Sequence, residues 1–242
     1  MKFEIPLEQG RFLKRYKRFF ADIEWKGQVI TAHVPNTGSL KSCSEANSPC
    51  LFSVSQNPER KLPYTLEMIQ APTGAWVGVN TANPNKLIKE ALHQGHFEWW
   101  KNYAEIKPEF KISAESRLDF ALSNPNSDKK HFIEVKNVTM VENRIAKFPD
   151  AVSERGQKHL RDLMKLKSDG HTAEIVFTIQ REDVDSFTTA DEIDPQYGEL
   201  FRKAIKSGVR VTPVVIVMNE KELAVSRKIL PILKGILKLK PF

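Results

Sequence analysis

The chain has 242 residues, of which 40% are hydrophobic and 28% are charged, and its formal net charge is +7. This composition is that of a globular protein with one large or two small cores, and the positive charge favours a polyanionic partner such as nucleic acid. Cys43 and Cys50 are the only cysteines, which excludes a disulfide framework and a four-cysteine zinc site, and no stretch has the pattern of a signal peptide or a membrane span. We therefore expect a reduced cytoplasmic protein without a membrane partner.

Residues 1–82 are expected to form a small β-barrel domain. Short runs rich in β-branched and aromatic residues alternate with clusters of Gly, Pro, Asn and Ser, and none has the period of a helix. The expected strands are 11–20, 22–25, 28–34, 51–54, 65–70 and 75–79. An OB-like barrel is one of several arrangements open to five or six such strands.

Basic residues of this first domain are candidates for contact with nucleic acid. In the first expected strand they alternate with aromatic residues, and such a face could bind phosphates while its rings stack on bases. A strand whose aromatic residues belong to the core and whose cations are merely solvated fits the same pattern. A turn at 35–38 and a loop at 58–63 could add contacts to the backbone. The candidate binding residues here are Arg11, Arg15, Lys17, Arg18, Asn36, Arg60 and Lys61.

A second domain, residues 83–242, is expected after the turn-forming segment 80–85. Its first helix opens at Pro84 or Asn85 and has apolar residues at helical spacing. Glu90 lies on this helix between two lysines, where it indicates by itself an ordinary surface charge. A strand is expected over 110–113, and Glu109 just before it is a second acidic candidate.

The two strands expected next carry the most informative pattern in the chain. Residues 116–122 and 132–138 alternate apolar and polar positions around a turn-rich connection, which predicts a hairpin. In a register that aligns the polar faces, Asp119 converges with Glu134 and Lys136. Two carboxylates so close repel unless a cation neutralises them, and Mg²⁺ or Mn²⁺ would do so while activating water for attack on phosphorus. A Glu-x-Lys pair alone is equally typical of a solvated sheet face.

The remaining elements complete an αβββαβαβ order. A helix capped by Ser153 is expected to reach about residue 168, and its first turns could bind a phosphate through oriented amides. The apolar strand 173–179 predicts a sheet covered on both faces, and a helix from 194 to 208 precedes a strand over 211–217. The tail 223–242 is basic and interrupted by Pro and Gly, so we assign it neither a single helix nor a membrane anchor. The candidate nucleic-acid-binding residues of this domain are Arg117, Arg155, Gln157, Lys158 and His159.

Segments 117–120, 133–139 and 148–160 resemble the signature segments of the sugar fermentation stimulation protein family. The resemblance spans nearly the whole chain. It implies an N-terminal OB-like barrel followed by a domain similar to the PD-(D/E)xK nucleases, an αβββαβ unit with a mixed sheet. It also implies binding to DNA without sequence specificity, and Glu90 matches an acidic position of the family in the first helix. The catalytic residues that the resemblance implies are Glu90, Asp119, Glu134 and Lys136, with Asp119 and Glu134 as metal ligands.

Two functions remain open at this point. The first is a Mg²⁺- or Mn²⁺-dependent nuclease that binds DNA through its backbone phosphates, which the complete set of side chains favours. The second is a non-catalytic DNA-binding regulatory factor in sugar (maltose) metabolism, since a fold match does not decide activity. An enzyme acting on a small metabolite fits less well, because the chain has no Gly-rich cofactor loop and no nucleophile elbow.

The hairpin pattern also predicts how the metal-free site behaves. Asp119 and Glu134 should repel each other, so that one of them resists ionisation unless Lys136 compensates. On this reasoning an amide in place of either carboxylate should leave the metal-free protein at least as stable.

Overall fold

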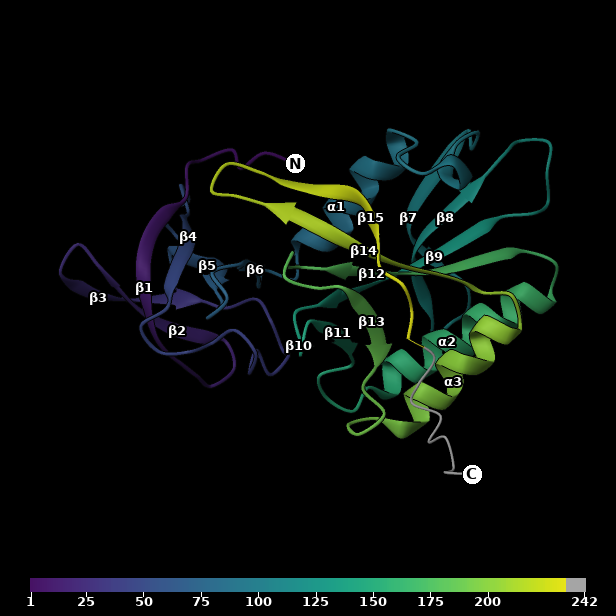
Figure 1. Cartoon of the computed structure of the whole chain (residues 1–242). Coiled ribbons are helices and arrows are strands. Elements are labelled where there is room, and N and C mark those ends of the chain that lie inside the picture. The colour runs from purple at the N-terminus through teal and green to yellow at the C-terminus, as the bar shows by residue number, and fades with distance from the viewer. Residues whose placement is uncertain (234–242) are drawn as a thin grey trace, which may run out of the picture.

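The structure is a computed structural model that describes residues 1–233, and it shows a small β-barrel followed by a larger domain built on a mixed sheet (Figure 1). The barrel strands are β1 (Glu8–Tyr16), β2 (Phe20–Trp25), β3 (Gln28–His33), β4 (Pro49–Val54) and β5 (Tyr64–Gln70). They pair in the order β1-β2-β3-β5-β4-β1, and the parallel pairing of β3 with β5 closes the barrel. The short strand β6 (Trp76–Gly78) pairs antiparallel with β5 at the edge of this sheet. The expected OB-like barrel is confirmed.

The first expected strand, residues 11–20, is interrupted by a tight turn. Strand β1 ends at Tyr16 and β2 begins at Phe20, while Lys17 and Arg18 both adopt left-handed conformations with φ of 46° and 63°. Two consecutive left-handed residues give the turn whose twist matches that of a hairpin. The rings of Tyr16 and Phe20 stack across its base with centroids 5.6 Å apart. Lys17 and Arg18 therefore lie at the tip of a hairpin rather than on a strand face.

The second domain has a six-stranded sheet in the order β15-β14-β12-β9-β8-β7, in which β9, β12 and β14 are parallel to each other. Its strands are β7 (Glu105–Lys111), β8 (Arg117–Ser123), β9 (His131–Val138), β12 (Thr172–Ile179), β14 (Arg210–Met218) and β15 (Leu223–Ile229). Its helices are α1 (Asn83–His93), the short 3₁₀ helix η1 (Glu98–Trp100), α2 (Glu154–Ser168) and α3 (Pro195–Lys206). A second, three-stranded sheet consists of β10 (Val141–Glu142), β11 (Ile145–Phe148) and β13 (Ser186–Thr189).

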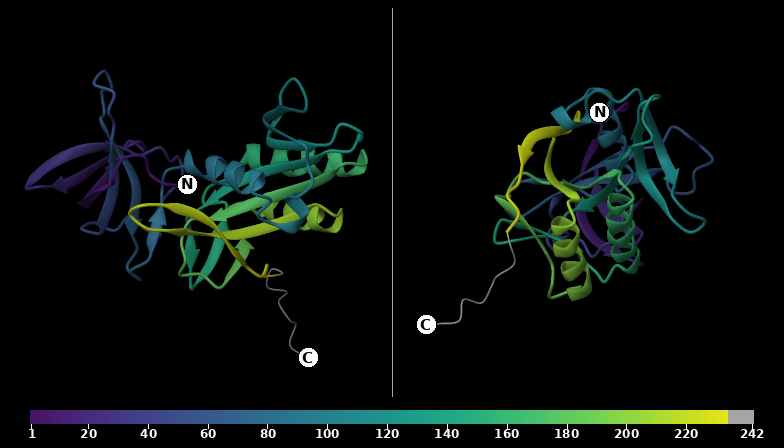
Figure 2. Two further views of the ribbon diagram at one scale, coloured as in Figure 1. Left: turned by 90° about the horizontal axis from the view of Figure 1, so that it is seen from above. Right: turned by 90° about the vertical axis from the view of Figure 1, so that its right-hand side faces the viewer.

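Helices cover both faces of the large sheet, as the apolar strand 173–179 predicted. Helices α2 and α3 lie side by side on one face (Figure 2), where Leu160 and Phe201 pack against Phe177. Helix α1 covers the other face, where Ile88 packs with Val176. Both helices expected after a capping residue begin there, because the side chains of Ser153 and Asp194 accept hydrogen bonds from backbone amides of the first turn.

One charged residue within this apolar strand is completely buried. Glu174 accepts hydrogen bonds from the indole of Trp100 and from His131, each at 2.9 Å, and also from Trp99 and Thr212. Four donors around one carboxylate satisfy it away from water. Glu174 therefore ties η1 to the α1 face of the sheet, and it lies on the face opposite to Glu134, because it is level with Ile133 in the parallel pairing.

Apolar and polar contacts both join the barrel to the second domain. Leu51 and Met68 of the barrel share a buried cluster with Leu87 of α1 and Ile216 of β14, and Met1 packs against it. A fragment that starts at residue 83 would expose this apolar surface to water. Such a truncation removes the barrel and also changes the stability of the second domain. Weaker binding of nucleic acid by this fragment would therefore not measure the contribution of the barrel alone.

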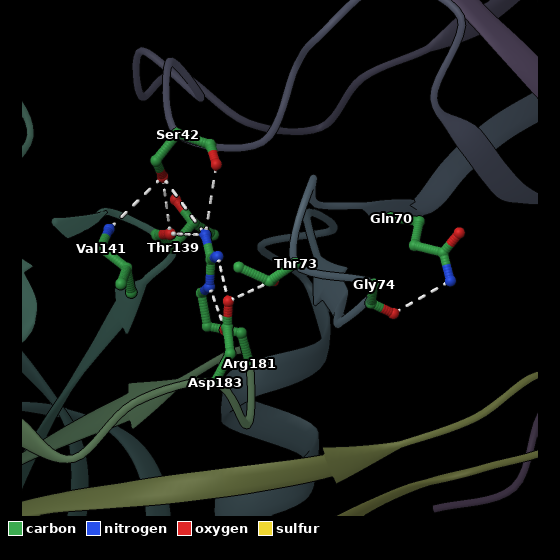
Figure 3. A network of polar contacts seen from close by, with 8 residues as sticks. All are labelled: Ser42, Gln70, Thr73, Gly74, Thr139, Val141, Arg181 and Asp183. Carbon is green, nitrogen blue, oxygen red and sulfur yellow. Dashed lines mark hydrogen bonds and ion pairs between the residues drawn. The ribbon is translucent and has the colours of Figure 1, made fainter. Parts of the chain in front are cut away.

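The polar part of the contact centres on Arg181, which is 3% exposed (Figure 3). Its guanidinium group donates two hydrogen bonds of 2.6 Å to Asp183 and others to Ser42 and to the carbonyl of Thr139. Thr73 of the barrel donates to the same carboxylate at 2.6 Å. Because Ser42 and Thr73 belong to the barrel domain, one buried arginine connects two of its loops to the second domain.

The end of the chain is described in part. Residues 223–229 of the basic tail form the antiparallel edge strand β15, and residues 234–242 lie outside the described residues. In the described part, no helix has the length and apolar character that crossing a membrane requires.

Candidate active site

The predicted convergence on the hairpin occurs where β8 and β9 separate. Their recorded pairing ends at Phe120 and Ile133, so the next pair in this register would be Asp119 and Glu134. Instead of a backbone pair, Asp119 Oδ2 accepts the amide proton of Val135 at 2.7 Å, and its Oδ1 accepts a hydrogen bond of 2.7 Å from Asn85 at the start of α1. The carboxylate thus replaces a missing backbone acceptor and is held beside Glu134.

Glu134 is 3% exposed and is surrounded by basic groups on one side only. Its Oε1 accepts a hydrogen bond from Lys136 Nζ at 2.6 Å and contacts His159 Nδ1, and these two nitrogens lie 3.1 Å apart. Burial acts to raise the pKa of Glu134, but Lys136 and His159 outweigh it, so the pKa is lowered. The other oxygen, Oε2, is buried and has no hydrogen-bond partner within residues 1–233.

The neighbouring carboxylate responds in the opposite way. Burial, followed by the negative charge of Glu134, raises the pKa of Asp119 to about 6. Asp119 is therefore the group that resists ionisation, because Lys136 compensates mainly Glu134. The expectation that an amide at either position leaves stability intact does not extend to Glu134, whose loss would leave Lys136 and His159 without their anion.

We expect Asp119→Asn to change the pH dependence of stability in the metal-free protein. The folded-state pKa of about 6 lies above the ordinary value of 3.8, so the folded state holds the proton longer and wild-type stability falls as the pH rises from about 4 to about 6. The variant should lack this fall and be more stable at pH 7 by about 1 to 3 kcal/mol. Urea unfolding in EDTA at pH 4, 5 and 7 measures both, with the exposed Asp128→Asn as control. Parallel curves for wild type and Asp119→Asn would contradict this assignment.

The residues present fit a hard divalent cation. Mg²⁺ and similar ions are typically bound by one or two carboxylates together with waters and substrate phosphates. In the described part of the chain no group of three or more His, Cys, Asp or Glu forms a complete metal site, so the protein would supply Asp119 and Glu134 and leave the other positions to water and substrate. An ion here would give Glu134 Oε2 the partner it lacks and would relieve the repulsion that raises the pKa of Asp119.

Helix α2 contributes to this site differently from the expectation. His159, assigned to the nucleic-acid surface, is buried and contacts Glu134. It lies on the buried stripe of α2 together with Gly156, Leu160 and Leu163, so the helical spacing that marked the leucines as core applied to the histidine too. Gln157, also assigned to nucleic acid, donates to the carboxylate of Asp194 that caps α3. The assignment of His159 is therefore corrected, whereas that of the partly exposed Gln157 stays a prediction.

The acidic candidates outside the hairpin do not join the site. The carboxylate of Glu90 lies 2.9 Å from the amino group of Met1. It follows Asn85 by five residues, which places it about 140° further around α1. Asn85 is therefore the residue that α1 brings to Asp119. Glu109 is exposed, has a φ of 51° and pairs with Arg117.

Two of the candidate binding residues in the barrel have structural partners instead. Arg15 donates to the carbonyls of Asn36 and Gly38 at 2.5 and 2.6 Å, and the buried side chain of Asn36 bonds Val79 and the amide of Gly38. These two residues hold the loop 36–38. The assignment of the buried Asn36 to nucleic acid is corrected, whereas that of the partly exposed Arg15 stays a prediction. Arg60 donates to Thr65.

The other basic candidates remain on the surface. Three of them take part in exposed ion pairs, with Glu24, Glu109 and Glu115 as the respective partners of Arg11, Arg117 and Lys158. The candidates that are exposed and enter no ion pair within the described residues are Lys17, Arg18, Lys61 and Arg155.

These features define a class of protein in which an OB barrel precedes a mixed-sheet αβ domain, with a cluster of the partly buried Asp119 and Lys136 around the buried Glu134. A family model described as the sugar fermentation stimulation protein RE domain matches residues 82–222, and the SfsA N-terminal OB domain matches residues 13–79. The chain belongs to the sugar fermentation stimulation protein family.

Individual relatives match over most of their length. A sugar fermentation stimulation protein homolog of Bdellovibrio bacteriovorus is 61% identical over 241 residues, which cover 96% of this chain and 99% of the relative. A homolog of Geotalea uraniireducens is 45% identical over 212 residues, with 87% and 90% covered. The structure of Pyrococcus furiosus SfsA in complex with Ca²⁺ superimposes with a TM-score of 0.85 at 27% identity, covering 96% of this chain and 97% of that one.

Proposed function

We propose that this protein binds DNA and hydrolyses a phosphodiester bond with Mg²⁺ or Mn²⁺ held by Asp119 and Glu134. The observation that carries the proposal is the buried, unpartnered Oε2 of a Glu134 whose lowered pKa keeps it ionised, beside a second carboxylate. A bound ion would act as Lewis acid on the phosphate and lower the pKa of a water. The relative from Pyrococcus furiosus was solved with Ca²⁺, another cation that prefers oxygen ligands, which supports a cation site in this family.

The surrounding residues have distinct roles in this proposal. Lys136 is held by Glu134 at 2.6 Å, and its side chain is 13% exposed, so its ammonium group can reach a phosphate or a water at the edge of the site. An ammonium group held in place by the fold could stabilise developing negative charge without reorganisation. His159 contacts both Glu134 and Lys136 and positions the lysine. Asn85 and the amide of Val135 hold Asp119.

A DNA-binding regulator of sugar (maltose) metabolism that does not cut DNA is the second candidate, and the relatives' name, which refers to sugar fermentation, supports only its link to sugar metabolism. Incubation of the purified protein with single-stranded, double-stranded and branched DNA in Mg²⁺ or Mn²⁺ separates the two functions. Cleavage that disappears in EDTA is the result expected for a nuclease. Binding without cleavage in either metal supports the regulator.

Binding to DNA should depend steeply on salt, because exposed cations scattered over both domains would contact backbone phosphates. In EDTA we expect the affinity to fall at least about 100-fold between 50 and 200 mM salt. Arg18→Ala and Arg155→Ala should each reduce the slope of log affinity against log salt by about 1. Fluorescence anisotropy measures this, with Arg144→Ala as control, since Arg144 is already neutralised by Asp185. A flat salt dependence would rule out the phosphate-contact account.

A further inference from the structure

A cavity of about 300 Å³ lies between the barrel and the second domain. The barrel domain lines it with the loop 36–38 and with Thr81, and the second domain lines it with the end of β9 from Asn137 and the segment 147–153 that leads into α2. Asn137 directly follows Lys136, Thr81 precedes the helix that carries Asn85, and the lining segment ends at the cap of the helix that carries His159. The cavity lining therefore adjoins, along the chain, three of the elements that supply the candidate active site.

The lining has no cation left for a phosphate. The ammonium group of Lys147 is bonded to Glu142 at 2.5 Å and to Glu192 at 2.8 Å. Asp150 Oδ2 accepts the amide proton of Ser39 at 2.7 Å and places a carboxylate at the wall. Every lining residue lies in the described part of the chain, and none is a second lysine or an arginine. The carboxylate of Asp150 would therefore repel a phosphate in this cavity, whereas it would not repel a neutral ligand.

Among the described residues, one buried side-chain atom of the lining lacks a partner. Asn137 Oδ1 is buried and accepts no hydrogen bond within residues 1–233. A buried carbonyl oxygen without a donor costs free energy, and a ligand with an N–H group would remove that cost once the partly exposed Asn137 side chain turns this oxygen toward the cavity. Phe148, Pro149 and Val152 add apolar surface. A flat ring with apolar faces and N–H donors at its edge matches this lining, and every nucleobase that can pair has those properties.

The size of the cavity excludes a duplex. Its volume equals that of a cube about 7 Å on a side, whereas the major groove of B-DNA alone is about 12 Å wide. Resting on the proposed function, we infer that the cavity takes one unpaired nucleobase of the strand whose phosphodiester lies at Asp119 and Glu134. The base comes from a single strand or from a nucleotide extruded from a duplex.

The barrel wall of this cavity is held in place before any ligand binds. Arg15 and the side chain of Asn36 brace the loop, and a Cβ atom at Gly38 would collide with Asp150 across the boundary between the domains. A braced wall does not lose entropy when it binds a ligand. This assigns Arg15 and Asn36 a role in binding through the shape of the loop rather than through direct contact with phosphate.

The test compares binding of three oligonucleotides by anisotropy, with Ca²⁺ in place of Mg²⁺ to limit cleavage: a single strand, its perfect duplex and a duplex with one mismatch. We expect the single strand to bind at least about tenfold more tightly than the perfect duplex. If the mismatched duplex binds as tightly as the single strand, the base in the cavity is one extruded from a duplex. If it binds as weakly as the perfect duplex, the base comes from a single-stranded substrate. Equal affinity for the single strand and both duplexes would overturn the inference.

Two variants locate the effect in the cavity. Ala151→Trp introduces a large side chain at an exposed position of the lining and should abolish the preference for the single strand, whereas Ala114→Trp, at an exposed position outside the lining, should retain it. Asn137→Leu should weaken single-strand binding by about tenfold, through loss of the buried acceptor. An Ala151→Trp variant that keeps the preference would overturn the inference. Calorimetric titration with Ca²⁺ separates the failures, because absent metal binding would defeat the proposed function, while intact metal binding without a strand preference would defeat only this inference.

Discussion

Lys136→Met is expected to lower metal-dependent DNA cleavage about 100- to 1,000-fold while it leaves metal binding in place. The ammonium group of Lys136 is held at 2.6 Å by Glu134, and its side chain is 13% exposed, so in the proposed mechanism its loss removes a fixed positive charge from beside the reacting phosphate. The two carboxylates that would bind the ion remain. Gel assays of labelled DNA in Mg²⁺ or Mn²⁺, together with calorimetry in Ca²⁺, measure the two effects separately.

Glu134→Gln should lose cleavage to at least the same extent and should also lose most of the metal affinity. Because this change leaves Lys136 and His159 facing each other without an anion, we expect a stability loss of about 3 to 5 kcal/mol, so its melting curve must be recorded before its activity is interpreted. Glu199→Gln, in an exposed pair with Lys203, is the matched control that should leave cleavage unchanged. Undiminished cleavage by Lys136→Met would remove the lysine from the proposed mechanism, and undiminished metal affinity in Glu134→Gln would remove the metal site.

Arg181→Met is expected to destabilise the protein by about 3 to 5 kcal/mol. The side chain is 3% exposed, and its removal would leave Asp183 without its bidentate partner and the carbonyl of Ser42 without this donor, while the carbonyl of Thr139 would keep only the hydroxyl of Ser42. Since Asp183 also accepts a hydrogen bond from Thr73, the damage reaches both barrel loops of the network (Figure 3).

Arg144→Met is the matched control for this prediction. Arg144 forms the same bidentate pair with Asp185, but the two side chains are 59% and 60% exposed, so its loss should cost less than about 1 kcal/mol. Urea unfolding of both variants compares a buried and an exposed pair of identical chemistry. Losses of equal size would show that burial of Arg181 does not strengthen the contact between barrel and second domain.

The hairpin that carries Asp119, Glu134 and Lys136 could be found in the sequence because strand alternation is a local property. A period of two places Glu134 and Lys136 on one face whatever the rest of the chain does, and the apolar positions around Asp119 limit the register of its partner strand. Helix caps are local in the same way, which is why Ser153 and Asp194 mark the starts of α2 and α3 correctly.

Partners across elements were decided only by the tertiary structure. Composition could not choose a closed OB barrel, because closure depends on the parallel pairing of β3 with β5, which are more than thirty residues apart in the register of Ala32 and Tyr64. The partner of a charged side chain could not be predicted from the sequence either. Glu90 pairs with the amino group of Met1, and Arg15 donates a hydrogen bond to the carbonyl of Gly38. The physical reason is that periodicity sets the direction of a side chain on its own element, whereas its neighbour is set by packing between elements distant in the chain.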